Sequence, residues 1–426
     1  MKKAFLVILA LVLLLSLCAC GEKEDDKDLN RPTTSVSAYK SKGEYPALQG
    51  QLTWEKINAQ PIKYAGMSID EMRTYSVDFF RFTKSALWIP DTDCDILDSA
   101  GEVKNTVTGG TVYGCLPYMG VSSGNVYRLM DYMDESTGVV NIKAAARLPR
   151  TFGNQCSFAA WWGWARVINS ADYDWTYSCV TSNNFPYLGE RLYDDELEQF
   201  GPDYGTDEVV READPQTLYE NYALLKKGDG IVNYTSAGHV VMIATDAVVV
   251  RTADGKVDPG QSYVTVIDQA GAWVDGVNEH GESYTYTSNV DVKWNFLTLQ
   301  SKNYLPFTFQ EFLGNDPVEE TELKLNHEGE TITQAQAEAL TLECNYSIAD
   351  LYVVAYDSKG NEVMKTAARC TWPNRHRLSF IPDDPNVPHV VTWGGWENVS
   401  EGDKITVYAQ LGTGERPVLW EGTFTQ

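Results

Sequence analysis

One cysteine, Cys156, stands where a thiol could act as a nucleophile. It follows the polar turn 152–155 and precedes the apolar segment 158–168, so we expect it at the start of a buried helix. The unpaired N–H groups and the dipole at a helix start stabilise an anion, and they favour the thiolate over the thiol. The sequence therefore predicts a reactive thiol at this point.

A thiol nucleophile needs a base within hydrogen-bond reach. Two histidines precede residue 316: His280 lies in a polar turn, whereas His239 opens the apolar strand 239–245 behind Gly238. A strand end holds a side chain at a fixed place, so we expect His239 to be the base. The alternative is an ordinary histidine at the end of a strand.

The base usually needs a third group that orients its ring. A predicted strand that begins at Tyr263 ends in Asp268 and Gln269, and antiparallel pairing with the 239–245 strand would bring this polar end beside His239. Alternation along a strand directs the two side chains to opposite faces, so only one of them can serve. Asp268 is the prediction, and Gln269 is the alternative.

These residues resemble a known family. The order Cys, His, polar residue, with Leu225-Lys226-Lys227-Gly228-Asp229 ahead of Gly238-His239-Val240-Val241-Met242-Ile243, is similar to the NlpC-type cysteine peptidases of the papain-like clan. The resemblance covers roughly residues 111–271. It implies that Cys156 is the nucleophile, that His239 is the base, and that Tyr118 lies near the active site.

The resemblance also implies a substrate and a mechanism. The expected reaction is the cleavage of an amide bond in cell-wall peptides or another surface amide, without a metal or other cofactor. Backbone N–H groups at the helix start would receive the oxyanion. Tyr118, Gln155 and Gln269 are the candidates for assisting them or for contacting substrate. Two departures from the family are Gln155, where an aspartate is common, and the long interval of 83 residues between Cys156 and His239.

The N-terminal end reads as a targeting segment. Lys2 and Lys3 precede an apolar run at 4–15, and a small-residue stretch ends at Cys20. This resembles the lipobox of bacterial lipoproteins, which implies cleavage before Cys20 and acylation of its thiol; an uncleaved N-terminal helix is the alternative. We therefore expect a signal peptide over 1–20 and an extracytoplasmic protein, anchored to the bacterial cell membrane through lipid on Cys20.

Charge and cysteine content narrow the classes of partner. The formal net charge is −25, which disfavours nucleic acid because phosphate binding needs clustered Lys and Arg. An exported protein can form disulfides. Cys344 and Cys370 are the preferred pair, and Cys94 with Cys115 is a weaker one. A disulfide between Cys156 and Cys179 would exclude the nucleophile.

The 426 residues divide into four parts by pattern. After the signal peptide, the polar stretch 21–50 is expected to be a flexible tether. Residues 51–315 are predicted to form an α+β papain-like domain of NlpC type, with the thiol on a helix and the histidine on an antiparallel sheet. Its first long helix begins with a capping box at Ser68 and is expected to end near residues 88–90. Residues 316–426 show about seven short strands, typical of an immunoglobulin-like β-sandwich.

Two other motifs and one rival function have to be weighed. The segment 120–124 matches G-x-S-x-G but lacks a strand before it. Residues 91–102 imitate a calcium loop without the glycine that the turn requires, so a solvated acidic loop is preferred. The rival function is a non-catalytic surface lipoprotein that binds glycan or protein through both domains.

Overall fold

The computed structural model describes residues 43–426 except 46–47, 63–65, 98–100, 120–122, 147–151, 176–177, 179, 182–183, 195, 236–237, 279, 316, 372–374, 382–388 and 393–394. The predicted signal peptide, Cys20 and most of the predicted tether lie outside these residues. The fold is mixed α and β with several antiparallel sheets, which confirms the α+β class. In the described part of the chain, no helix has the length and apolarity needed to cross a membrane.

The first large unit is a nine-stranded mixed sheet. Its strands are β1 (Leu87–Pro90), β4 (Tyr113–Gly114), β5 (Met133–Asp134), β6 (Val139–Val140), β7 (Gly230–Asn233), β8 (His239–Val248), β9 (Tyr263–Val277), β10 (Ser283–Asn295) and β11 (Leu305–Phe307). They follow the spatial order β11-β7-β8-β9-β10-β4-β1-β6-β5. The pairs β7–β8, β8–β9 and β9–β10 are antiparallel. This part carries the predicted histidine and aspartate strands side by side.

The helices around this sheet are mostly short. Beside the two that position the site, they are α2 (Trp54–Asn58), α4 (Val126–Met130), α5 (Ile142–Ala146), α7 (Thr206–Glu212), α8 (Pro215–Tyr222), α9 (Phe296–Ser301) and α10 (Gln310–Leu313), with a 3-10 turn at Ser170–Asp172. A separate hairpin joins β2 (Cys94–Leu97) to β3 (Val103–Val107).

The longest helix is α3 (Ile69–Ser85), and its start is encoded locally. The Ser68 side chain accepts from the backbone N–H of Glu71, and the Glu71 carboxylate accepts in return from the backbone of Ser68, which confirms the capping box. The helix ends at Ser85, earlier than the expected end near residues 88–90. The apolar residues there form β1, a fully buried strand that pairs with β4 and β6. Burial between two strands therefore decides against helix at this segment.

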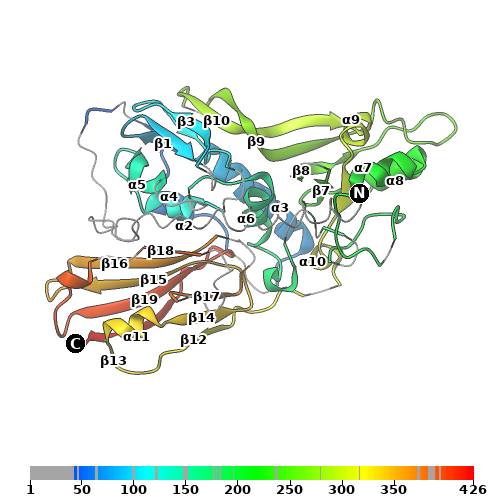
Figure 1. Ribbon diagram of the computed structural model, residues 1–426. Helices are drawn as coiled ribbons and strands as arrows, with labels where there is room; N and C mark the ends of the chain where they lie inside the picture. Colours follow the sequence, from blue (N-terminus) through cyan, green and yellow to red (C-terminus); the bar gives the residue numbers. More distant parts are fainter. Residues whose placement is uncertain are drawn as a thin grey trace, which may run out of the picture.

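The second helix that positions the site is α6 (Cys156–Trp164). All nine of its residues are buried, because apolar side chains point in every direction around it. It contacts α3 as well as β8 and β9, so it lies between a helix and the sheet. Its tryptophans Trp161, Trp162 and Trp164 are at most 3 % exposed and belong to the core. Figure 1 shows α3 and α6 between β9–β10 and the C-terminal strands.

The C-terminal part consists of two sheets that share a core. The smaller sheet has β12 (Leu323–Leu325), β14 (Thr341–Cys344) and β17 (Arg377–Ser379); the larger has β13 (Thr331–Ile332), β15 (Ile348–Tyr356), β16 (Glu362–Cys370), β18 (His389–Thr392), β19 (Lys404–Leu411) and β20 (Val418–Phe424). The helix α11 (Gln334–Glu338) and a 3-10 turn at Trp396–Asn398 complete this part. Residues from both sheets form one apolar cluster. All seven strands expected here are present, and β13 and β18 are additional.

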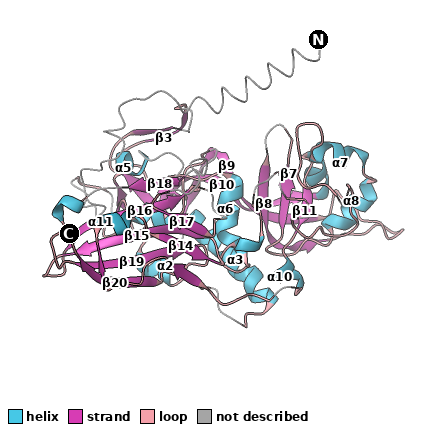
Figure 2. Ribbon diagram, turned by 60° about the horizontal axis from the view of Figure 1, so that its bottom comes forward, coloured by secondary structure: helices cyan, strands magenta, loops and turns pink. Residues whose placement is uncertain are grey.

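The two parts lie against each other (Figures 1 and 2), and buried contacts join them. Behind α6, the Trp161 indole donates to Ser347 Oγ at 3.2 Å, and a Cβ on Gly412 would lie 3.1 Å from the Ala165 Cβ. Beside α4, Arg128 pairs with Asp350 on β15 at 2.9 Å, and both side chains are at most 2 % exposed. The C-terminal sheets therefore form part of the environment of the helix that carries the thiol.

Candidate active site

Cys156 is the first residue of α6, as the sequence predicts. Gln155 is the N-cap of α6, and its carbonyl accepts the first intrahelical hydrogen bond from the Ala159 N–H at 2.9 Å. The N–H groups of the first turn therefore lie at the end of the helix that carries Cys156. Cys156 carries a thiol and is 2 % exposed. Its sulfur lies 3.9 Å from the carbonyl oxygen of Gly238, the residue before His239.

A close-packed turn fixes the approach of the chain to Cys156. Gly153 has φ +84°, and a Cβ there would lie only 2.8 Å from the Pro117 carbonyl oxygen. On its other side, the N–H of Gly124 donates to the Gly153 carbonyl at 2.8 Å. Only glycine suits this position, and the clamp between two neighbouring segments sets where α6 begins.

His239 opens β8, and its ring is held between Cys156 and Asp268. The Nε2 atom lies 3.0 Å from Asp268 Oδ2. Since an ionised carboxylate only accepts, Nε2 carries the proton of this bond, and Nδ1 is the nitrogen available to the thiol. The His239 side chain is 26 % exposed and Asp268 is 2 % exposed. The base therefore reaches solvent while its orienting partner is covered.

Asp268 is itself fixed by the next strand. Its Oδ1 accepts from the backbone N–H and from the side-chain amide of Asn289 on β10, both at 2.8 Å. The β9–β10 ladder shifts register just after the Asp268–Asn289 pair, and Asp291 there has φ +54°. This bulge sets the local twist of β10 beside the carboxylate. Three hydrogen bonds, counting that to His239, leave Asp268 in one orientation.

The pKa shifts of the three groups agree with this geometry. Burial is the largest influence on Cys156 and alone would raise its pKa, but the hydrogen bond and charge of His239 and the N–H groups of Val240 and Ser157 lower it overall. Burial opposes protonation of His239, yet the bonds to Asp268 and Cys156 raise its pKa to about 10. The pKa of Asp268 is lowered despite burial, through His239 and Asn289. A thiolate–imidazolium pair is therefore the favoured state.

Two further candidates lie next to the nucleophile turn. Tyr118 is half-buried, and its segment pairs with Asn154, two residues before Cys156, through the bond from the Met119 N–H to the Asn154 carbonyl at 3.0 Å. Its ring would lie 3.7 Å from a Cβ on Gly271, which brings it beside β9. Gln155 is buried, and its amide donates to Ser157 Oγ at 2.9 Å, along the first turn of α6.

Gln269 does not reach the site, contrary to its candidacy for oxyanion or substrate contact. It is fully buried on the opposite face of β9 from Asp268. Its amide donates to the Leu116 carbonyl at 2.8 Å and to Thr287 Oγ1 at 3.0 Å. The alternation argument thus separates the two neighbours, and Asp268 is the one beside His239.

The segment 225–229, which carries part of the family resemblance, has a structural place. Asp229 is fully buried and pairs with Arg73 on α3 at 2.7 Å. Gly228 has φ +86°, and its carbonyl accepts from the Trp164 indole at 2.7 Å. This turn therefore ties β7 to α3 and to the far end of the helix that bears Cys156.

The predicted disulfides are wrong. Cys344 and Cys370 carry thiols, and so do Cys94 and Cys115. Cys94 lies in the β2–β3 hairpin, whereas Cys115 lies beside Lys84 and Gln269 under β9, so these two belong to different surroundings. Cys179 lies outside the described residues. Since Cys156 carries a thiol, the feature that would have excluded a nucleophile is not present at that residue.

The remaining motifs have other placements. Gly120, Val121 and Ser122 of the G-x-S-x-G match lie outside the described residues, and Ser123 donates to the Cys370 carbonyl at 2.9 Å. In the calcium-like segment, Asp93 accepts from the Gly109 N–H and Asp95 from Thr106 Oγ1, each at 2.8 Å across the β2–β3 hairpin. Among the described residues, no cluster of three or more His, Cys, Asp or Glu side chains could hold a metal.

Two residues of the site are not among those predicted from the sequence. Asn289 lies on β10, and only the β9–β10 register brings it to Asp268. Tyr304 follows α9 and packs on His239, with ring centroids 6.3 Å apart. Burial, with the nearby charges of Asp268 and Cys156, raises the pKa of Tyr304, so the phenol stays neutral beside the pair. A hydrogen-bonding asparagine and a buried tyrosine have no local signature.

Comparison with known proteins gives no further guide: no protein-family model, curated protein or solved structure matches this chain.

Proposed function

We propose that the chain is a cysteine hydrolase that cleaves amide bonds. One observation carries the proposal: the Cys156 thiol at the start of α6 interacts with His239, and Nε2 of His239 lies 3.0 Å from Asp268 Oδ2. A nucleophile, a base and a group that orients the base are the parts that thiol-dependent acyl transfer requires.

The reaction follows from the positions of these groups. The Cys156 thiolate attacks the amide carbonyl carbon, and N–H groups at the start of α6 stabilise the oxyanion that forms. The His239 imidazolium gives its proton to the leaving amine, and a thioester remains on Cys156. His239 then takes a proton from water, whose oxygen attacks the thioester, and the acid is released with Cys156 restored. Asp268 keeps the imidazole in one tautomer throughout.

The substrate class and the location come from the sequence. The similarity to NlpC-type peptidases supports cell-wall peptides, or another surface amide, as substrate and a papain-like fold for the first part. The lipobox-like segment at Cys20 supports an extracytoplasmic protein on a lipid anchor, with the membrane as its other partner. The two C-terminal sheets, with their shared core, are compatible with an immunoglobulin-like sandwich.

A thiol-reactive probe and a matched variant test the proposal. The full chain is treated with iodoacetamide near neutral pH, and labelling of each cysteine is followed at the peptide level. We expect Cys156 to react far faster than Cys115, which is equally buried but does not lie beside His239. We also expect Cys156→Ala to abolish release of amines from wall fragments while Cys344→Ala retains it. Slow labelling of Cys156, together with no hydrolysis that depends on it, would exclude the enzyme.

The rival function is a surface lipoprotein without turnover that binds glycan or protein. It predicts retention of the full chain on wall glycan, equally for wild type and for Cys156→Ala, and no release of amines. The pairing of Cys156 with an oriented, titratable histidine favours the hydrolase, because binding alone does not require it.

A further inference from the structure

A buried lysine lies directly behind the proposed catalytic residues. Lys84, in the last turn of α3, is 3 % exposed, and among the described ion pairs none joins it to a carboxylate. Its ammonium instead donates to Gln269 Oε1, lies 3.6 Å from Cys115 Sγ, and stands 4.6 Å from the centre of the Phe80 ring. Burial of a cation without a carboxylate partner is unfavourable, so a lysine at this position suggests a functional role.

The hydrogen bond from Lys84 to Gln269 acts on β9, the strand that also carries Asp268. Gln269 accepts from Lys84 and Cys115 through Oε1, and donates to Leu116 and Thr287 through Nε2. Both ends of its amide are therefore engaged. Because neighbouring strand residues point to opposite faces, a fixed Gln269 fixes the direction of Asp268 toward His239.

The second contact controls the segment in front of Cys156. Cys115 has φ +62°, which is unusual for a residue with a side chain, and its sulfur lies 3.1 Å from the Leu116 carbonyl oxygen. The chain continues into Pro117, whose carbonyl accepts from the Asn154 N–H at 3.1 Å. Lys84 is thus connected through Cys115 and the Pro117 carbonyl to the turn that starts α6.

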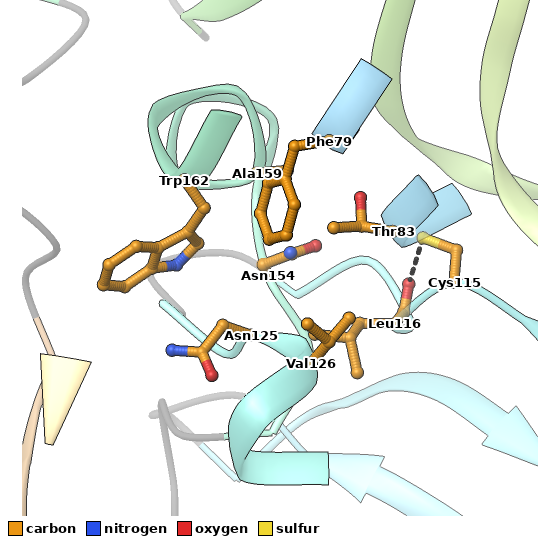
Figure 3. A pocket seen from close by; sticks show the side chains of 9 residues that line it. All are labelled: Phe79, Thr83, Cys115, Leu116, Asn125, Val126, Asn154, Ala159 and Trp162. Atoms are coloured by element: carbon orange, nitrogen blue, oxygen red, sulfur yellow. Dashed lines mark hydrogen bonds between the residues drawn. The ribbon is translucent and has the colours of Figure 1, made fainter. Parts of the chain in front are cut away.

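Little space separates this segment from α6. A cavity of about 10 Å³, roughly the room for one water molecule, lies between them. Figure 3 shows Cys115 and Leu116 on one side of it, and Asn154 and Ala159 on another. A displacement of the 115–116 segment by more than this space would therefore move the residues around Cys156.

The charge of Lys84 also acts on the proposed site. The titratable groups whose charge acts on Lys84 are Cys115, Asp268 and Cys156, from the segment after β4, from β9 and from α6. Burial lowers the pKa of Lys84 overall, while negative charge on these three groups raises it. The interaction is reciprocal, so Lys84 favours the ionised forms of Asp268 and Cys156 when it is protonated.

We propose that Lys84 is a positioning residue for the Cys156–His239–Asp268 set, acting through Gln269 and Cys115, and through its charge when it is protonated. The inference rests on the proposed function for its role in hydrolysis, but its effect on the Cys156 thiol exists whether or not the chain turns over. It also assigns a role to Gln269, which is hidden from substrate, and to the unusual backbone at Cys115.

The test is the pH profile of Cys156 alkylation in the full chain, measured at the peptide level. Lys84→Met removes the charge and the donor, whereas Lys84→Gln keeps a donor for Gln269 without the charge. We expect the profile to move to higher pH in both, with labelling near neutral pH about tenfold slower for Lys84→Met if the thiol shifts by about one pKa unit. Lys293→Met, which removes an exposed lysine from β10, should leave the profile unchanged.

The outcomes separate the two proposals. An unchanged profile in a folded Lys84→Gln or Lys84→Met protein overturns the role of Lys84, even if hydrolysis by the wild type is observed. If the Lys84 variants shift the labelling profile but the wild-type protein hydrolyses nothing, the role of Lys84 is supported and the proposed function is rejected. If Lys84→Met does not fold, Lys84→Gln decides alone, and a profile shifted only by Lys293→Met also counts against the proposal.

Discussion

Two groups of buried charges in this molecule are built on opposite principles. At the boundary with the C-terminal sheets, Asp131 faces Lys365 at 2.9 Å and Arg369 at 2.6 Å, while Arg128 faces Asp350. Beside Cys156, the partners are an imidazole, a thiol, one carboxylate and a lysine without a carboxylate. The first group matches acids with permanent cations, and the second leaves protons able to move.

The contrast appears in the direction of the pKa shifts. Burial would raise the pKa of Asp131, but Lys365 and Arg369 hold it far below its usual range. That carboxylate therefore stays ionised well below the pH range in which an ordinary aspartate titrates. In the second group, the pKa of His239 rises and that of Cys156 falls because each stabilises the charged form of the other. Permanent pairs hold parts together, whereas titratable pairs can do acid–base chemistry.

The largest effect should come from removing the titratable base. His239→Ala should lower hydrolysis of wall fragments on the order of 10⁴-fold, because both activation of the thiol and protonation of the leaving amine are lost. Initial rates of amine release measure it. His280→Ala, in an exposed turn, is the matched control and should keep wild-type rates. Equal losses in both variants would remove His239 from the mechanism.

The next effect concerns the permanent pairs. Arg128→Met should lower the free energy of unfolding by about 3–5 kcal/mol, since it leaves the Asp350 carboxylate buried without its main partner. Urea denaturation measures it. The double variant Arg128→Met/Asp350→Leu should recover much of the loss, because no uncompensated charge remains. A control at an exposed pair, Arg251→Met, should cost less than about 1 kcal/mol.

A smaller effect is expected from the group that orients the base. Asp268→Asn keeps the size of the side chain but removes the charge that stabilises the imidazolium, so hydrolysis should fall roughly 10²-fold. Cys156 labelling should also fall at neutral pH, because a less stable imidazolium on His239 stabilises less of the Cys156 thiolate. If labelling rates at all pH values match those of the wild type, Asp268 does not control the pair.

Titration of His239 should also make the free energy of unfolding depend on pH. The pKa of His239 is about 10 in the folded chain, against an ordinary value of 6.5, so its contribution is complete below pH 6.5 and is lost as pH rises toward 10. The difference in unfolding free energy between wild type and His239→Gln should therefore shrink over that range. A difference that grows with rising pH would show that His239 is buried as a neutral ring.

The smallest effect is expected at the boundary cysteine. Cys370→Ala should cost about 1 kcal/mol or less, because the variant keeps the backbone carbonyl that accepts from Ser123 and Arg128. A reductant should leave the unfolding midpoint of the wild type unchanged. Loss of a disulfide would instead cost about 2–5 kcal/mol, and a destabilisation of that size on reduction would restore the predicted pairing.

Prediction from the sequence succeeded where the signal is local. The capping box at Ser68, the start of a helix at Cys156 and the strand beginning at His239 all depend on neighbouring residue types, and the structure has each of them. Alternation along one strand was enough to separate Asp268 from Gln269. The end of α3 was misplaced because burial of residues 87–90 between two strands outweighs a continuing apolar pattern.

The sequence by itself determined the α+β class, the chemical types at the site and their order along the chain. Only the tertiary structure decided which distant groups meet: Asn289 with Asp268, Tyr304 with His239, Lys84 with Gln269, and α4 with the C-terminal sheets. The physical reason is that these contacts depend on strand register and on packing between elements far apart in sequence. A one-residue slip would send every side chain of β9 to the other face, and no local pattern records which partner strand prevents it.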